Sequence, residues 1–151
     1  MVTMEPGPEG QAVHRRGRRS WIASLPLLVI PLLAYVGFAA AGADFGTSRF
    51  DVTMPSGGMW HLALGDILLV IGLGLLFFEI LKATRTGGAS IIDHAFSMIV
   101  FVVCLILFLI WTRAATSTFF LLMLMAMIDV IAGFSVTINA ARRDYGATGP
   151  D

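Results

Sequence analysis

The stretch STFFLLMLMAMIDVIAGFSVTINA, residues 117–140, decides the fold class. It carries a single ionisable side chain, Asp129, in an otherwise apolar and weakly polar run. A membrane-crossing helix needs about 20 mostly apolar residues. Backbone N–H and C=O groups in hydrocarbon must find their partners within the segment, and a helix satisfies them. Residues 117–140 therefore predict a transmembrane helix.

Three further apolar runs of similar length lie at about 91–111, 59–81 and 21–42. The 151-residue chain is 57% hydrophobic and 13% charged. That charged share is about half of the roughly 25% found in soluble domains. A soluble domain of this size could not bury so much apolar surface. The sequence predicts an all-α fold, a polytopic membrane bundle of four transmembrane helices over residues 21–141.

The Lys and Arg residues predict the orientation of this bundle. Eight of them lie before the first run, between the second and third, or after the fourth: Arg15, Arg16, Arg18, Arg19, Lys82, Arg85, Arg142 and Arg143. Only Arg49 and Arg113 lie in the other connections. Short loops rich in Lys and Arg stay in the cytoplasm. Both ends are therefore predicted to be cytoplasmic, as a disordered basic tail at 1–20 and a short tail at 142–151.

Other local signals agree with four spans. Ser90 and Asp93 have the spacing of a capping box that opens the third helix. Thr116 or Ser117 can cap the fourth helix. Pro26 lies in the first run and predicts a kink there, as does Pro31. Tryptophan is typical of membrane–water boundaries, and all three tryptophans fall at predicted ones: Trp21, Trp60 and Trp111.

The first run has a second interpretation, as a signal sequence. RRSW at 18–21 is typical of a twin-arginine signal, and AGA at 41–43 has the form of a cleavage site. The run between them is longer than the 7–15 residues of an ordinary signal. A retained helix is the favoured interpretation, and cleavage would leave three helices.

Asp129 is the most informative polar residue. A charge near the centre of a membrane helix costs about 2.5–3.5 kcal/mol on insertion scales. It is interpreted either as a proton or cation site or as a structural hydrogen-bonding group, and the structural role is favoured because no Lys or Arg lies inside a span. Asp66 in the second run gives the alternative of a paired-acid proton relay, with the two carboxyls about 8 Å apart in depth at the helical rise.

The remaining polar residues predict little chemistry. Glu79 and Lys82 have i,i+3 spacing and predict an interfacial ion pair. His61 and His94 fall at opposite ends of predicted spans, and the one cysteine, Cys104, lies in an apolar run, so no metal site or cofactor is predicted. The motifs of nucleophilic, zinc-dependent and phosphate-binding enzymes are missing from the sequence.

Several blocks of the sequence resemble a known class of protein. They are GD at 65–66, FEILKATR at 78–85, DH at 93–94, ATSTFF at 115–120, DV at 129–130 and ARRD at 141–144. Over roughly residues 59–145 the chain is similar to small bacterial inner-membrane proteins of unassigned function. The resemblance implies a multi-pass location in that membrane and brings no activity, ligand or catalytic residue.

The sequence thus favours a non-enzymatic accessory or structural subunit of a membrane complex, or a homo-oligomer. Its expected partners are the lipid bilayer and other membrane helices, and no nucleic acid. The basic tail is expected to hold anionic lipid head groups at Arg15, Arg16, Arg18 and Arg19. The alternative is a small oligomeric proton- or cation-coupled transporter or channel subunit that uses Asp129 and Asp66.

Overall fold

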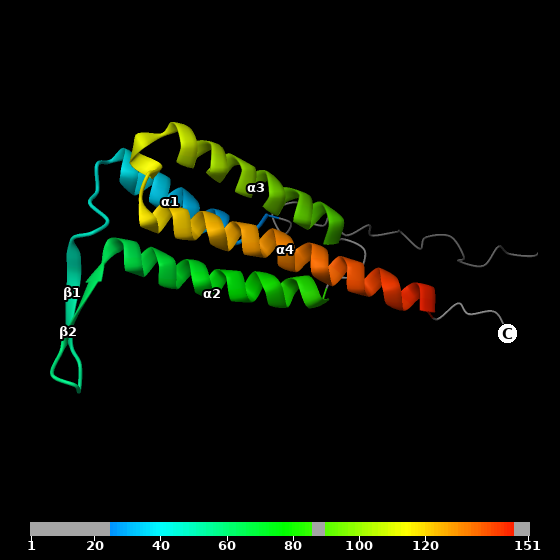
Figure 1. The fold of residues 1–151 in the computed structure, drawn as a ribbon, viewed down its shortest axis with the longest axis horizontal. Helices are drawn as coiled ribbons and strands as arrows, with labels where there is room; N and C mark the ends of the chain where they lie inside the picture. The colour runs from blue at the N-terminus through cyan, green and yellow to red at the C-terminus, as the bar shows by residue number, and fades with distance from the viewer. Residues whose placement is uncertain (1–24, 86–89, 147–151) are drawn as a thin grey trace, which may run out of the picture.

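The computed structural model describes residues 25–85 and 90–146, and it is mostly helical, as the apolar runs predict. The elements in chain order are α1 (Val29–Ala40), β1 (Ser48–Thr53), β2 (Met59–Ala63), α2 (Leu64–Arg85), α3 (Ser90–Ile110), the 3₁₀ turn η2 (Thr112–Ala114) and α4 (Ser117–Gly146). The helix α4 lies between α2 and α3, and α1 packs on α2 and α4 (Figure 1). The four helices form one bundle, with the β-hairpin at one end.

Two segments in the described part of the chain are long and apolar enough to cross a membrane, Leu64–Ala83 and Ser117–Val136. Two shorter apolar helices accompany them, Val29–Ala40 and His94–Ile110. Large hydrophobic side chains are exposed on the outer sides of all four helices, and examples are Leu33, Leu73, Phe77, Leu109, Ile110 and Ile131. The bundle therefore has an apolar exterior as well as an apolar core.

The ends of α1 are set by local chemistry. Pro31 falls in the first helical turn, where no backbone N–H is needed, so the predicted kink inside this helix is wrong for Pro31. At the other end Gly42 has a φ of 79°, its N–H donates to Ala39, and the N–H of Ala43 donates to Phe38. These two bonds form a Schellman motif, which ends a helix at a glycine. Gly42 in the AGA sequence is thus the helix stop of α1.

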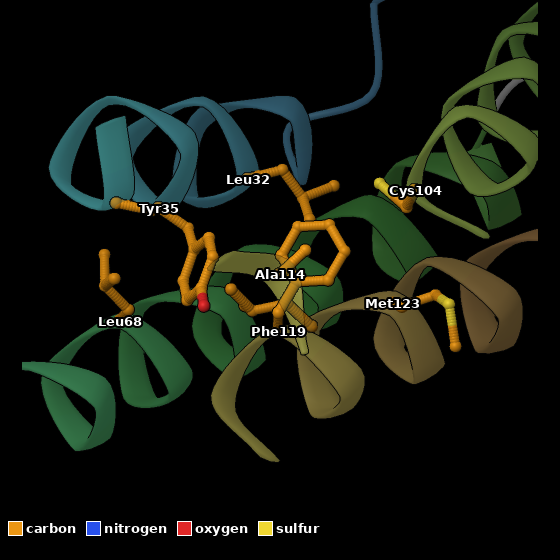
Figure 2. Packing of buried hydrophobic residues seen from close by; sticks show 9 residues of the cluster. Leu32, Tyr35, Leu68, Cys104, Ala114, Phe119 and Met123 are labelled. Carbon is orange, nitrogen blue, oxygen red and sulfur yellow. The ribbon is translucent and has the colours of Figure 1, made fainter. Parts of the chain in front are cut away.

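The core lies where the four helices and η2 meet, and Figure 2 shows it from close by. Tyr35 of α1 is fully buried and stacks on Phe45, with ring centroids 4.2 Å apart. Its hydroxyl donates to the carbonyl of Arg113 at 2.9 Å and lies 2.6 Å from the hydroxyl of Thr116. Arg113 in turn donates to the last carbonyls of α1, at Ala39 and Ala40. The first helix is therefore joined to the turn before α4 by polar and apolar contacts.

The first turn of α4 is capped by one of the two residues that the sequence predicts for this role. The Thr116 hydroxyl accepts a hydrogen bond from the backbone N–H of Phe119 at 3.2 Å, which is the bond of an N-cap residue. Of the two predicted caps, Thr116 is the one that makes this bond. The Ser90–Asp93 capping box concerns side chains that lie outside the described residues.

The structure differs from the prediction at the beginning of the second run. The run at 59–81 predicts a helix from residue 59, but Met59–Ala63 form β2 and α2 begins at Leu64. The strand forms because residues 50–53 alternate between apolar and polar and pair with 59–62 in antiparallel register. Gly57, with a φ of 83°, turns the chain between the strands. Hydropathy alone does not distinguish a short apolar strand from the first turn of an apolar helix.

Candidate functional site

Five polar side chains gather between α2, α3 and α4, in the part of the bundle away from the hairpin. We call this group the polar cluster, and its members are Glu79, Lys82, His94, Ser97 and Asp129. Four of them are buried, with Glu79 6% exposed and Asp129 5% exposed. The side chain of Lys82 is about one third exposed. Buried polar groups need hydrogen-bonding partners, and buried charges need opposite charges nearby.

Glu79 connects two helices of the bundle. One carboxylate oxygen accepts a hydrogen bond from Lys82 Nζ at 3.2 Å, so the predicted i,i+3 pair forms. The other oxygen accepts a hydrogen bond at 2.9 Å from the backbone N–H of Leu27, just before α1. The sequence predicts that this pair reaches outward to the interface, whereas Glu79 is buried inside the bundle. Its carboxylate thus holds the beginning of α1 against α2.

Asp129 connects α4 to α3. Its carboxyl shares a hydrogen bond with the side chain of Ser97 and interacts electrostatically with Glu79, His94 and Lys82. Helical spacing puts Ala126, Asp129 and Gly133 on one side of α4, and all three are buried. The surroundings of Asp129 are therefore polar, although the residues next to it in the sequence are apolar.

The lack of a side chain at Gly133 leaves the space that the His94 ring occupies. A Cβ atom at this position would overlap the imidazole ring of His94, at Nδ1, Cε1 and Cγ. The ring also lies 6.1 Å, centroid to centroid, from the ring of Phe134. The close approach of α3 to α4 at this level requires a residue without a side chain.

Asp66 is not part of the polar cluster. It lies in the first turn of α2, where its carboxylate accepts a hydrogen bond from the backbone N–H of Ala63 at 2.9 Å. This bond, in which the side chain of the N3 residue accepts from the backbone N–H of the N-cap residue, is one of the two bonds of a capping box. Gly65 packs against Thr118, so Asp66 is level with the start of α4. Asp129 is eleven residues beyond Thr118, about 16 Å along the axis at 1.5 Å per residue, and the predicted pairing of these two acids is therefore wrong.

Sequence reasoning missed His94 and Ser97 as neighbours of Asp129. The available signal was their i,i+3 spacing, which puts both on one face of an otherwise apolar helix. The partner of Asp129 among the acids is Glu79, and only the packing of α2 on α4 brings these two together. The four arginines predicted to bind head groups, Arg15, Arg16, Arg18 and Arg19, lie outside the described residues.

A second polar contact lies on the hairpin. Asp51 and His61 are directly opposite each other, and His61 Nδ1 donates to the Asp51 carboxylate at 2.7 Å. The hydroxyl of Ser48 donates to the same oxygen at 2.6 Å. These bonds, first that of Ser48 and then that of His61, hold the pKa of Asp51 below its ordinary value of 3.8.

The hairpin is expected to loosen in acid because of this carboxylate. The folded pKa of Asp51 lies below the unfolded one, so its stabilisation is complete above the unfolded value and is lost as the pH falls through the folded value. Below about pH 3.8 the amides of β1 and β2 should exchange hydrogen faster, after correction for intrinsic rates, than those of the helices. Asp51→Asn should remove this pH dependence. An unchanged dependence in the variant would show that another group is responsible.

No protein-family model matches the chain, and no curated protein or solved structure is significantly similar to it. Among the residues that the structure describes, no three His, Cys, Asp or Glu side chains are grouped closely enough to hold a metal ion.

Proposed function

We propose that this chain is a multi-pass protein of a bacterial inner membrane in which all four helices cross the bilayer and both ends are cytoplasmic. Support comes from the two long apolar helices and from the exposed hydrophobic side chains on every helix. Exposed apolar surface of this extent is typical of contact with lipid or protein partners. The cations of the described residues agree with this orientation, since Lys82 and Arg85 are near the end of α2, and Arg49 and Arg113 are the two of these residues that lie near the hairpin.

The retained first helix is part of this proposal. Leu32, Tyr35 and Ala39 of α1 are buried in the core. The carboxylate of Glu79 binds the backbone just before α1, and Arg113 binds the carbonyls at its end. A chain cleaved after residue 43 would lose these contacts, so the packing favours a helix that stays in the bundle over a signal sequence.

We infer a non-enzymatic, structural role in a membrane assembly for this bundle. The observation that carries it is the set of bonds in the polar cluster: Glu79 binds α1 and Lys82, and Asp129 binds Ser97 of α3. Each acid is thereby engaged in holding helices together. The lipid-facing sides remain for contact with lipid, with further copies of the chain or with larger partners.

A proton- or cation-coupled transporter is the second candidate, and one observation favours it. Asp129, Glu79, His94 and Lys82 are close enough to interact electrostatically. Ionisable side chains grouped inside a membrane bundle are typical of proton pathways. In this candidate the partners of Asp129 are Glu79 and His94, and Asp66 has no part.

Substitution of Asp129 distinguishes the two functions. Asn keeps the size and hydrogen-bonding capacity of Asp but cannot ionise. In the structural role Asp129→Asn should leave thermal stability close to wild type, and Asp129→Ala should lower it by about 0.5–2 kcal/mol. The pure wild-type protein in vesicles should carry no proton or cation flux above empty vesicles. Flux that disappears in a correctly folded Asp129→Asn variant would establish the transporter instead, and Asp66→Asn serves as the control that should retain it.

A further inference from the structure

One face of the β-hairpin is wholly apolar, and the other carries polar side chains together with Met59. In the antiparallel register Phe50 lies opposite Leu62, and Val52 lies opposite Trp60. Cross-strand neighbours point to the same side of a sheet, and successive residues alternate between sides. These four residues therefore form one surface, which we call the hairpin face. The opposite surface carries the Asp51–His61 contact.

The hairpin face is uncovered in the described structure. Phe50 is 65% exposed and Trp60 is 49% exposed. A two-stranded hairpin is marginally stable in water by itself, and it needs a further strand or an apolar surface to pack on. An occupant that covers the hairpin face would supply this surface.

The direction of the strands indicates which occupant fits. Figure 1 shows β1 and β2 running across the direction of the helices at one end of the bundle and extending past α2. If the helices cross a bilayer, such a hairpin runs along the membrane surface rather than away from it. The hairpin also leads directly into α2, which begins at Leu64. Farther along α2 the side chains of Val70 and Leu73 are exposed. If the helices cross a bilayer, the hairpin is therefore level with the border between lipid-facing helix and water.

We propose that the hairpin face lies in the head-group layer of the outer leaflet, with Phe50, Val52, Trp60 and Leu62 turned toward the lipid chains. This proposal rests on the membrane location proposed above. An indole belongs at such a boundary, because its ring is apolar and its N–H can bind water or lipid carbonyls. The Asp51–His61 contact then faces water, where a carboxylate and an imidazole are well solvated.

Tryptophan fluorescence of the full chain in vesicles tests the proposal. The variant Trp21→Phe/Trp111→Phe keeps Trp60 as the sole tryptophan, and the vesicles contain phosphatidylglycerol, phosphatidylethanolamine and phosphatidylcholine brominated on its acyl chains. Trp60 should emit at shorter wavelength than in water and lose most of its intensity to the brominated lipid. Iodide, present on both sides of the membrane, should quench it weakly. Strong quenching by iodide without quenching by lipid would overturn the proposal, and protection from both would overturn it in favour of a second protein copy.

Three further variants separate this inference from the membrane proposal itself. Phe77→Trp, in a chain with all three native tryptophans changed to Phe, reports on the exposed side of α2. Quenching of this tryptophan without quenching of Trp60 contradicts only the hairpin inference, whereas a protein that does not float with vesicles contradicts both. Val52→Lys should reduce quenching of Trp60 by lipid, and its neighbour Thr53→Lys, on the opposite face, should not. Equal effects of these two lysines would show that the hairpin face has no special contact.

Discussion

Replacement of Glu79 by alanine is expected to give the largest loss of stability of any single change in the polar cluster. The change removes the acceptor for the backbone N–H of Leu27 and the carboxylate that pairs with Lys82. Removing one partner of a buried ion pair costs about 3–5 kcal/mol. The lower end applies here, because Lys82 is partly exposed and can turn toward water. Thermal or denaturant unfolding in mild detergent should measure this loss.

Two control variants show which contact of Glu79 matters most. Glu79→Gln keeps an oxygen that can accept from Leu27 and should cost about 1–2 kcal/mol. Lys82→Ala keeps the bond to Leu27 but leaves the buried Glu79 carboxylate without its cation, so it should cost more than an exposed pair contributes and less than the roughly 3 kcal/mol expected for Glu79→Ala. A Lys82→Ala variant as unstable as Glu79→Ala would contradict the importance of the connection to α1.

Gly133→Ala is expected to destabilise the bundle by about 1–3 kcal/mol, as overpacking of a tight core does. The added methyl group would overlap the His94 ring, so the ring must move or α3 must separate from α4. Displacement of His94 would also disturb Asp129, with which it interacts. Thermal unfolding of the purified variant should show the loss.

Gly74→Ala is the matched control, because it makes the same change inside α2. A Cβ at Gly74 would meet no atom within 4 Å. Alanine in an open helical position is more favourable than glycine by about 0.5–1 kcal/mol. The two variants should therefore differ in sign. If Gly133→Ala were as stable as Gly74→Ala, the close approach of His94 to α4 would be wrong.

The helices could be predicted because each lies within a long apolar run of the sequence. The helix α4 begins at the predicted residue, Ser117. The hairpin was not predicted, because four of the five residues of β2 are apolar and run without a break into the apolar helix that follows. Their strand conformation depends on pairing with residues 48–53, and hydropathy does not contain that information. The same error set the second helix too early and placed Asp66 inside it rather than at its cap.

Only part of the candidate site could be predicted from the sequence. Asp129 stands out in an apolar run, since an ionisable residue there is costly. Its partners come from two other helices, α2 and α3, and their positions depend on how these helices are rotated and shifted against α4. Glu79 is explained equally well by its neighbour Lys82 in the sequence, and the bond to Leu27 spans 52 positions along the chain. Local spacing cannot identify a contact of that kind.

Accessibility of single cysteines in intact cells tests the four-span proposal most directly. Cys104 is first changed to serine, and one cysteine is then introduced at Val13, Gly57 or Gly146. A membrane-impermeant thiol reagent should label the Gly57 position, in the turn of the hairpin, from outside the cell. The Val13 and Gly146 positions should react only after the membrane is opened. Labelling of Gly146 from outside would reverse the orientation, and labelling of Val13 from outside, with Gly57 also accessible, would show that the first helix does not cross the membrane.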